Sequence, residues 1–375
     1  MTPMTKRRLR RFDGFAGLLG LALLAGCASE PPAPPLSAAM SPAEARALIE
    51  TLLPRTVTDR TGWVDDIYAG FAVQAIEPTR RNVCAVVAVI GQESSFRVNP
   101  SVPGLGKIAW REIDSRAERA GVPRMVVHGA LSLKSPTGRT YAERIDGAKT
   151  EKELSDIFED FIGTVPLGHS LFEGWNPVRT RGPMQVNIAF AEQYARARPY
   201  PYPVKSRIDD EVFTRRGGLY FGIGHLLAYP ASYDSYLYRF ADFNAGQYAS
   251  RNAAFQRAVS TVSGIQLIPD GALLPHDTTV QGAGSTELAA VAVAGKLNLS
   301  ERAIHDALDE GKSKDFERTQ LYQRVFALAD KAQGRPLPRA IVPRITLHGP
   351  KISRNLTTGW YAHRVDERFK SCLKG

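Results

Sequence analysis

Residues 83–96, VCAVVAVIGQESSF, decide the fold because a continuous apolar run ends there at an abrupt polar boundary. Residues 83–90 are apolar on every helical face, which predicts a helix buried inside a domain rather than lying on its surface. The β-branched residues leave a buried strand as the alternative. In both cases Glu93 lies at the point where polar residues begin.

Glu93 has the position expected of a general acid. A carboxyl group that is partly withdrawn from water has its charged form disfavoured and its pKa raised, as a proton donor at neutral pH requires. The competing interpretation is that Glu93 caps or salt-bridges a helix end, since structural ion pairs also occupy such places. The helix alone does not decide between the two.

The first 27 residues predict export and lipidation. Five basic residues between positions 6 and 11 precede an apolar run, residues 15–24, that is too short to span a bilayer. LAGC at 24–27 resembles the lipobox of bacterial lipoproteins, so we expect cleavage before Cys27 and a lipid on Cys27. An uncleaved signal anchor is the alternative. Ala28, where aspartate would resemble an inner-membrane retention signal, favours an outer-membrane lipoprotein that faces the periplasm.

The charge balance narrows the class of partner. The chain carries a net charge of +10, of which the predicted signal peptide, residues 1–26, holds five basic residues and Asp13, or +4, so the mature chain keeps +6. Moderate positive charge suits an acidic polymer or anionic lipid head groups. Nucleic acid is not expected as a partner in the periplasm.

Two cysteines besides Cys27 remain after processing, Cys84 in the apolar run and Cys372 near the C-terminus. The periplasm permits a disulfide between them, which would tie the tail to the element that carries Glu93. Two isolated buried thiols are the alternative, because proximity cannot be read from sequence.

The rest of the chain predicts a tether followed by a mainly α-helical protein. Residues 27–40 are a Pro/Ala-rich tether, and SPAE at 41–44 has the pattern of a helix-starting capping box. Residues 41–375 could be one domain or two, with a core at about 80–262, an insertion at about 97–180 that holds helices of its own, and a helical C-terminal extension at about 285–375. We expect helices at residues 43–53, 63–75, 80–92, 151–161, 187–196, 215–229, 236–240, 249–262, 286–297, 300–310 and 316–331.

Three separated segments resemble one known pattern. QESS at 92–95, GPMQ at 182–185 and FNAG at 243–246 are similar to the "ES", "GLMQ" and "YNAG" motifs of the goose-type lysozymes and family 1 lytic transglycosylases, and they occur in the same order. The chain also resembles a group of Gram-negative lipoproteins known as DUF1615. The motif resemblance covers roughly residues 80–262 and says nothing of the C-terminal hundred residues.

The resemblance implies a lysozyme-like α-helical fold whose cleft holds a glycan strand. It implies that Glu93 is the catalytic acid/base, that Ser94 steadies Glu93 or contacts substrate, that Met184 shapes the floor of the cleft, that Gln185 lines it and that Asn244 bonds a sugar acetamido group or holds the catalytic centre. A helix-end hydroxyl and an ordinary core methionine are the alternatives for Ser94 and Met184.

The chain also departs from the pattern. About ninety residues separate Glu93 from Met184, so an insertion must lie beside or over the cleft. Pro183 replaces the usual leucine, and Phe243 replaces the tyrosine, which removes one possible hydrogen bond to substrate or to Glu93.

The number of available carboxylates predicts the chemistry. Ordinary glycoside hydrolysis uses two, and only Glu93 lies inside a matching motif. A single carboxylate can still cleave a MurNAc glycoside if the N-acetyl group of the substrate stabilises the reacting centre and its C6 hydroxyl attacks, which leaves a 1,6-anhydro end. Asp242 could be a second carboxylate and restore hydrolysis, or be an exposed helix aspartate. Trp175 could stack on a sugar or simply be buried.

Other chemistries lack support. The seven histidines show no HExxH or other metal spacing, and neither a complete phosphate loop nor a G-x-S-x-G elbow is present. The sequence therefore predicts no metal and no cofactor, with a peptidoglycan glycan strand as substrate and the membrane reached through lipidated Cys27. The alternatives to the transglycosylase are a non-catalytic peptidoglycan-binding protein, a structural envelope lipoprotein and a hydrolytic muramidase that uses Asp242.

Overall fold

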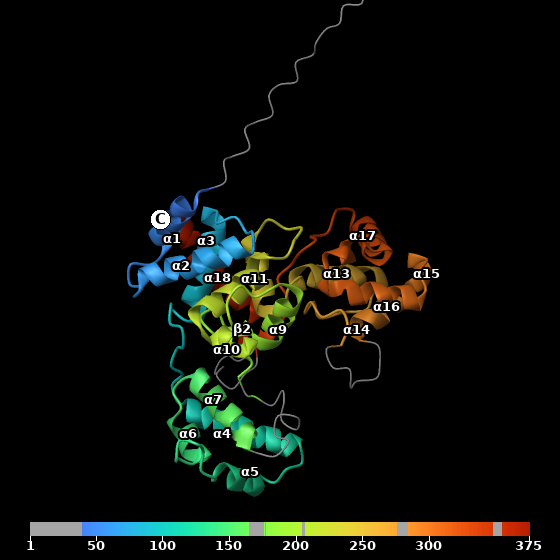
Figure 1. Ribbon diagram of the computed structural model, residues 1–375. Coiled ribbons are helices and arrows are strands. Elements are labelled where there is room, and N and C mark those ends of the chain that lie inside the picture. The colour runs from blue at the N-terminus through green and yellow to red at the C-terminus, as the bar shows by residue number, and fades with distance from the viewer. Residues whose placement is uncertain (1–39, 165–175, 177, 205–206, 276–283, 348–354) are drawn as a thin grey trace, which may run out of the picture. The chain divides into compact units, whose positions relative to one another are not determined.

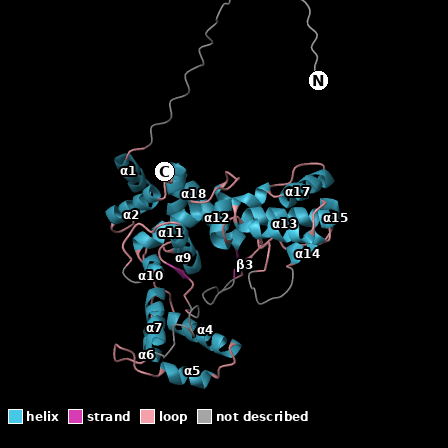
Figure 2. Ribbon diagram, turned by 45° about the vertical axis from the view of Figure 1, so that its right-hand side comes forward, coloured by secondary structure: helices cyan, strands magenta, loops and turns pink. Residues whose placement is uncertain are grey.

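A computed structural model describes residues 40–164, 176, 178–204, 207–275, 284–347 and 355–375. These parts of the chain are mainly helical, as Figure 2 shows, so the predicted helical class is confirmed. The strands are two short antiparallel pairs. β1 (Thr180–Arg181) pairs with β2 (Val186–Asn187), and β3 (Thr346–Leu347) pairs with β4 (Leu356–Thr357).

One hydrophobic core holds helices from both ends of the chain. It contains buried side chains of α1 (Pro42–Leu52), α2 (Arg60–Val73), α3 (Arg80–Glu93), α9 (Ile188–Ala197), α10 (Ile208–Phe213), α11 (Arg215–Leu227), α12 (Tyr236–Ala245) and α18 (Thr358–Lys374). The sequence sets the start of α1 locally, because Ser41 and Glu44 form the predicted capping box. Residues 83–90 of α3 are all buried, as an all-apolar helix requires.

Helices α4 (Leu105–Arg119), α5 (Arg124–Leu131), α6 (Tyr141–Gly147) and α7 (Glu151–Thr164) lie in the segment predicted to be an insertion, about 97–180 (Figure 1). They bury a second cluster of their own around Leu105, Tyr141 and Ile157, which Phe213 of α10 joins. Arg181, only 1% exposed, pairs with Asp209 at 3.1 Å and donates to Ser155 of α7 at 2.8 Å. The hairpin strand β1 is therefore linked to both α7 and α10.

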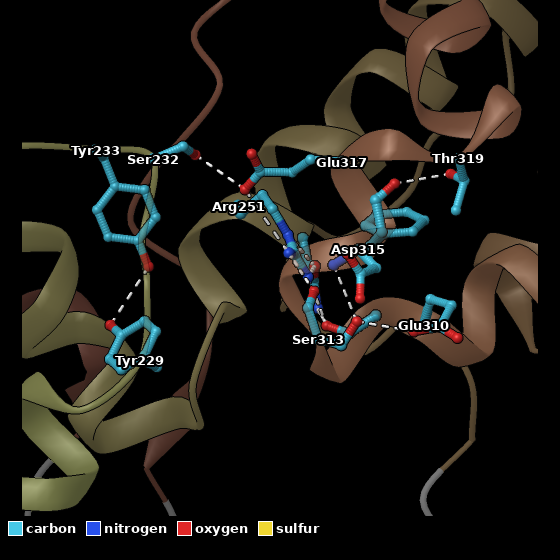
Figure 3. Close-up of polar contacts among 12 residues, drawn as sticks. Tyr229, Ser232, Tyr233, Arg251, Glu310, Ser313, Asp315, Glu317 and Thr319 are labelled. Atoms are coloured by element: carbon cyan, nitrogen blue, oxygen red, sulfur yellow. Dashed lines mark hydrogen bonds and ion pairs between the residues drawn. The ribbon is translucent and has the colours of Figure 1, made fainter.

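A third cluster gathers the helices between α12 and α18. It contains residues of α13 (Ala249–Ser263), α14 (Ser285–Val291), α15 (Ala294–Leu297), α16 (Glu301–Asp309), the 3₁₀ turn η2 (Lys314–Arg318) and α17 (Gln320–Gln333). Fully buried Arg251 of α13 donates at 2.7 Å to the carbonyls of Gly311, in the 3₁₀ turn η1 (Glu310–Lys312), and Ser313 (Figure 3). Glu317 faces Arg251 at 3.8 Å and accepts a bond from Ser232 at 2.9 Å. The buried guanidinium of Arg251 therefore has backbone carbonyl acceptors where α13 meets the segment 310–318.

The hydrophobic core extends beyond residues 80–262, the segment that the motif resemblance covers. Helices α1 and α2 precede residue 80, yet they share the core of α3. Helix α18 lies in the predicted C-terminal extension, about 285–375, and its Tyr361, Val365 and Phe369 are buried in the same core. It packs against α3 and α12, and Figure 1 shows α18 beside α3. The last helix is therefore part of the framework that carries Glu93.

Candidate functional site

Glu93 is the last residue of α3 and is half-buried. Immediately after it, Ser95 and Phe96 adopt left-handed backbone angles, with φ of 51° and 61°. A bulky residue such as Phe96 rarely adopts this conformation, and Trp63 holds its ring in an edge contact with centroids 5.3 Å apart. Strained residues of this kind cluster at functional sites, so the chain reversal after Glu93 marks a candidate site.

Ser94 is the C-cap residue of α3. It is 5% exposed, and its hydroxyl donates to the carbonyl of Ile90 at 3.2 Å. The backbone N–H of Ser94 bonds to the same carbonyl at 3.0 Å. Its geometry is that of the helix-end hydroxyl, and no contact with Glu93 is needed to explain it.

The GPMQ segment is the turn that joins β1 to β2. Gly182 has a φ of 74°, and a Cβ there would lie 2.1 Å from the carbonyl oxygen of Val212, so only glycine fits. Met184 is fully buried in the main core, which makes it a packing residue under the turn. Gln185 is half-buried, and its amide bonds within the hairpin to Thr180 at 3.0 Å and to Gly182 at 3.3 Å.

The glycines of α11 let this turn approach closely. A Cβ on Gly218 would lie 2.4 Å from Cδ of Pro183, and one on Gly222 would lie 2.4 Å from Sδ and 2.7 Å from Cβ of Met184. Pro183, which departs from the leucine of the resembled motif, therefore packs where α11 has no side chain. The hairpin and α11 fit each other through these two contacts.

We expect Gly222→Ala to destabilise the protein by about 1–3 kcal/mol, because the added methyl group overpacks a filled core. Thermal or urea unfolding measures the change. Gly163→Ala in α7 is the matched control, since a Cβ there meets nothing within 4 Å, and replacing a helical glycine is neutral or stabilising. Equal stabilities of the two variants would contradict the close approach of the hairpin.

Asn244 lies in the last turn of α12 and is exposed. Its Oδ1 accepts a hydrogen bond of 2.7 Å from the hydroxyl of Thr358, the first residue of α18, which is fully buried. With Oδ1 engaged, the amide N–H donors are the groups that Asn244 can offer to a ligand. Phe243 beside it points into the core and is 7% exposed.

Tyr361 of α18 is the neighbour of Glu93. The Tyr361 side chain is 5% exposed, and its burial, followed by the nearby charge of Glu93, raises the pKa of Tyr361 well above its usual value. Tyr361 therefore stays neutral near the carboxylate. Because Thr358 and Tyr361 are three positions apart on one helix, their side chains lie next to each other on the same face of that helix. The first turn of α18 consequently brings Glu93 and Asn244 together.

Asp242 matches neither of its two expected roles. It is fully buried rather than exposed on its helix or accessible to a substrate. One oxygen accepts from the hydroxyls of Tyr229, at 2.8 Å, and Tyr233, while the other accepts from the backbone N–H of Ser250 at 2.7 Å. Burial raises the pKa of Asp242 against the opposing effect of these bonds. Asp242 is a buried structural carboxylate that links α12 to α13.

His225 of α11 lies between two rings, Phe190 of α9 at 4.4 Å and Phe243 of α12 at 4.9 Å between centroids. These contacts bring α9, the helix after the GPMQ turn, close to α12, whose last turn carries Asn244. Burial lowers the pKa of His225 from 6.5 to about 4, because the charged imidazolium is poorly solvated there.

The burial of the neutral His225 imidazole predicts that the folded protein becomes less stable in acid. Between pH 6.5 and 4 the unfolded chain binds a proton at His225 that the folded protein does not bind, so stability falls as the pH falls through that window. At about 1.4 kcal/mol per pKa unit the loss is about 3 kcal/mol. We expect His225→Phe to unfold with a correspondingly smaller pH dependence in urea titrations at pH 7 and pH 4. Exposed His363→Gln is the control, and an unchanged pH dependence in His225→Phe would contradict a neutral buried imidazole.

A disulfide joins Cys84 of α3 to Cys372 of α18, with Cα atoms 5.6 Å apart. The choice between a bridge and two isolated thiols, which the sequence left open, is thereby decided. The side chain of Arg368 also donates to Gln92 at 3.2 Å. Tyr361 and Thr358 were missed in the sequence because they lie outside the resembled segments. The signal that could have found them is the apolar helical spacing of Tyr361, Val365 and Phe369 upstream of Cys372.

Some expectations fall outside the described residues. Cys27 with the lipobox and Trp175 are among them. Within the described residues, no group of three or more His, Cys, Asp or Glu side chains could hold a metal ion. No helix in the same residues is both long and apolar enough to cross a membrane.

Comparison with known proteins gives a family and a relative. A family model described as "Protein of unknown function (DUF1615)" matches residues 56–375. The "Uncharacterized protein YaiW" of Escherichia coli (strain K12) is 51% identical over 352 residues, which cover 94% of this chain and 95% of the relative. No solved structure matches the chain.

Proposed function

The chain belongs to the DUF1615 family, and because the description of that family names no activity we propose a function from the site itself. We propose a lipid-anchored peptidoglycan lytic transglycosylase with a lysozyme-like helical core, in which Glu93 is the catalytic acid/base. The observation that carries the proposal is the group at the first turn of α18. There half-buried Glu93 lies near Tyr361, and Thr358, one helical turn before Tyr361, binds Asn244.

The proposed reaction cleaves the β-1,4 bond between MurNAc and GlcNAc with one protein carboxyl group. Protonated Glu93 gives its proton to the glycosidic oxygen as the bond from that oxygen to the anomeric carbon of MurNAc breaks. The N-acetyl oxygen of the same MurNAc stabilises the positive anomeric carbon. The C6 hydroxyl then attacks this carbon and returns its proton to Glu93. One bond is exchanged for another within the substrate, so no water is consumed and the product is a 1,6-anhydro end.

The surroundings of the site support a single carboxylate. The two carboxyl groups of an ordinary glycosidase flank the scissile bond, so both must reach the substrate. Asp242 is two residues from Asn244, but it is fully buried and its oxygens accept bonds from two tyrosines and a backbone N–H. It gives no support to a hydrolytic muramidase. The donor groups of Asn244 suit the acetamido oxygen of an amino sugar, which needs a hydrogen-bond donor.

The proposed location follows from the N-terminal sequence. A lipid on Cys27 would anchor the protein in the outer membrane, and the Pro/Ala-rich tether at 27–40 would extend the helical part into the periplasm. The peptidoglycan layer lies in that compartment, and the net charge of +6 expected for the mature chain suits its acidic stem peptides.

The decisive experiment is digestion of purified peptidoglycan sacculi by the soluble form that begins after Cys27, with products identified by mass spectrometry. Anhydro-MurNAc ends released by the parent protein and not by Glu93→Gln support the proposal. Reducing ends point instead to hydrolysis. If the protein sediments with sacculi but does not cleave them, it is a non-catalytic binding protein. If it neither binds nor cleaves them, it is a structural envelope lipoprotein.

A further inference from the structure

Helix α5 of the insertion and the residues beside it carry a group of exposed apolar side chains, here called the α5 patch. Its members are Val122, Met125, Val126 and Leu133, which are 36%, 85%, 60% and 61% exposed. Met125 and Val126 share one face of α5 with Gly129, because residues three and four apart are neighbours on a helix. A Cβ on Gly129 would meet nothing within 4 Å, so this face of α5 is open.

The opposite face of α5 is the one that folding uses. Leu131 is buried in the core of the insertion, and half-buried Val127 packs against that core. The ring of His128 lies on Trp110 of α4 with centroids 4.6 Å apart, and its Nε2 shares a hydrogen bond of 2.8 Å with Asp114. Both ribbon views show α5 at the edge of the group that it forms with α4 and α6 (Figures 1 and 2). Packing within the insertion therefore does not account for the α5 patch.

The chain around the α5 patch is basic. Residues 119–142 contain no Asp or Glu, and their cations are Arg119, Arg124, Lys134 and Arg139. Over residues 105–139 there are seven basic and three acidic residues, so 7 − 3 = +4, whereas residues 140–164 have three basic and seven acidic, so 3 − 7 = −4. Arg124 is partly balanced by Asp114 at 3.9 Å and Glu118 at 3.5 Å. The insertion is thus electrically divided, and the α5 patch lies in its positive half.

A fixed turn holds two of these cations next to the apolar side chains. The backbone N–H of Ser135 donates to the carbonyl of Arg139 at 2.8 Å, and that of Tyr141 donates to the carbonyl of Leu133 at 3.2 Å. Lys134 and Arg139 are both exposed. The turn therefore presents positive charge directly beside Leu133.

We propose that the α5 patch docks on an anionic phospholipid surface. Met125, Val126 and Leu133 enter the boundary between head groups and acyl chains, while Lys134 and Arg139 lie among the lipid phosphates. The inference goes beyond the proposed function, because it gives the folded part of the chain a membrane contact separate from the lipid predicted on Cys27. It does not depend on cleavage by Glu93.

Shape and charge favour a lipid surface over a second copy of this chain. Met125 and Val126 protrude into solvent, and a bilayer interface accommodates protruding apolar side chains without a preformed groove. A two-fold dimer through the α5 patch would place the same surface on both sides of the interface. The cations of the two copies would then face one another, whereas lipid phosphates would neutralise them.

The test is flotation of the soluble form that begins after Cys27 with two kinds of vesicle. One kind is phosphatidylcholine alone, and the other is phosphatidylcholine and phosphatidylglycerol in a three-to-one ratio. We expect the protein to float with the anionic vesicles and not with the neutral ones. Raising the ionic strength from 0.1 M to 1 M should weaken flotation, because it shortens the screening length from about 10 Å to about 3 Å.

Two pairs of substitutions separate the apolar and the charged contributions. Met125→Asp/Val126→Asp should weaken vesicle binding by about tenfold or more, because buried apolar side chains of this size contribute at least that much. Lys134→Gln/Arg139→Gln should weaken it by about fivefold for each cation removed. Gly129→Leu adds an apolar side chain to the open face and should tighten binding by about tenfold.

The matched controls make the same chemical changes elsewhere. Ile268→Asp adds an acid at another apolar residue, 71% exposed, and Lys331→Gln/Arg335→Gln removes two exposed cations near the end of α17. Both should bind vesicles as the parent does. Melting temperatures confirm that the variants are folded, which we expect for exposed positions.

Three results would overturn the inference. They are a parent protein that floats with neither kind of vesicle, equal flotation with both kinds, and undiminished flotation of a folded Met125→Asp/Val126→Asp protein. A parent that is dimeric by light scattering and becomes monomeric in that variant would assign the α5 patch to a second copy instead. Glu93→Gln should float as the parent does, so a failure of the proposed reaction leaves this test intact.

Discussion

Glu93→Gln is expected to reduce the release of anhydro-MurNAc ends by about 10²- to 10⁴-fold, the usual contribution of a general acid/base. The amide has nearly the shape of the carboxyl group, but it cannot give a proton to the glycosidic oxygen. Stability should change little, because Glu93 is half-buried at a helix end. Product release by mass spectrometry and the melting temperature measure the two effects separately.

Two further variants isolate the role of Glu93. Glu50→Gln removes an exposed carboxylate from α1 and should leave product release unchanged. Asp242→Ala removes a buried carboxylate and leaves the Ser250 N–H and two tyrosine hydroxyls without their acceptor, so we expect a loss of about 1–3 kcal/mol of stability. Undiminished release by a folded Glu93→Gln protein would exclude Glu93 as the acid.

The helices predicted from the sequence were those with strong local signals. The capping box at Ser41 and the all-apolar run of α3 depend on residues a few positions apart, and both are present in the structure. Helix α12 was predicted to end at Phe240, whereas it continues to Ala245. The extension includes Asp242 and Asn244, whose partners lie on other elements. The sequence pattern near α12 does not show these distant contacts, so it could not predict the longer helix.

The GPMQ turn was recognised as a motif, but its geometry was not predictable. The turn is a hairpin connection whose Pro183 and Met184 pack on Gly218 and Gly222 of α11, more than thirty residues later. Whether Met184 was a core residue or a substrate contact depended on this packing. The structure makes it a core residue.

The residues of the candidate site also fall into two groups, those named from the sequence and those found only in the structure. Glu93 and Asn244 were named from the sequence, since short motifs kept their order. Tyr361 and Thr358 come from the last helix, which no motif covered. Asp242 was misjudged because a helix aspartate is mostly exposed, while here tyrosines 9 and 13 positions before it supply the hydrogen bonds that burial requires. Contacts between distant segments decided each of these cases.

Removing the disulfide is expected to cost about 2–5 kcal/mol of stability in Cys84→Ala/Cys372→Ala, measured by urea unfolding. The bridge spans 288 residues, and the loss of chain entropy that a cross-link imposes on the unfolded state grows with loop length, which favours the upper part of this range. The soluble form that begins after Cys27 has these two cysteines alone. Reduction of the parent protein should therefore lower its stability to that of the double variant.

The disulfide should also affect the site, because Cys372, Tyr361 and Thr358 belong to one helix. Without the bridge, α18 keeps its core contacts but opens more often, so amide hydrogen exchange in α18 should accelerate and anhydro-end release should fall. The double variant is its own control, since reductant should no longer change it. Full activity together with a stability loss would mean that core packing alone holds the first turn of α18 in place. Loss of both would mean that the site depends on a covalent link that only an oxidising compartment allows, as expected for a protein exported to the periplasm.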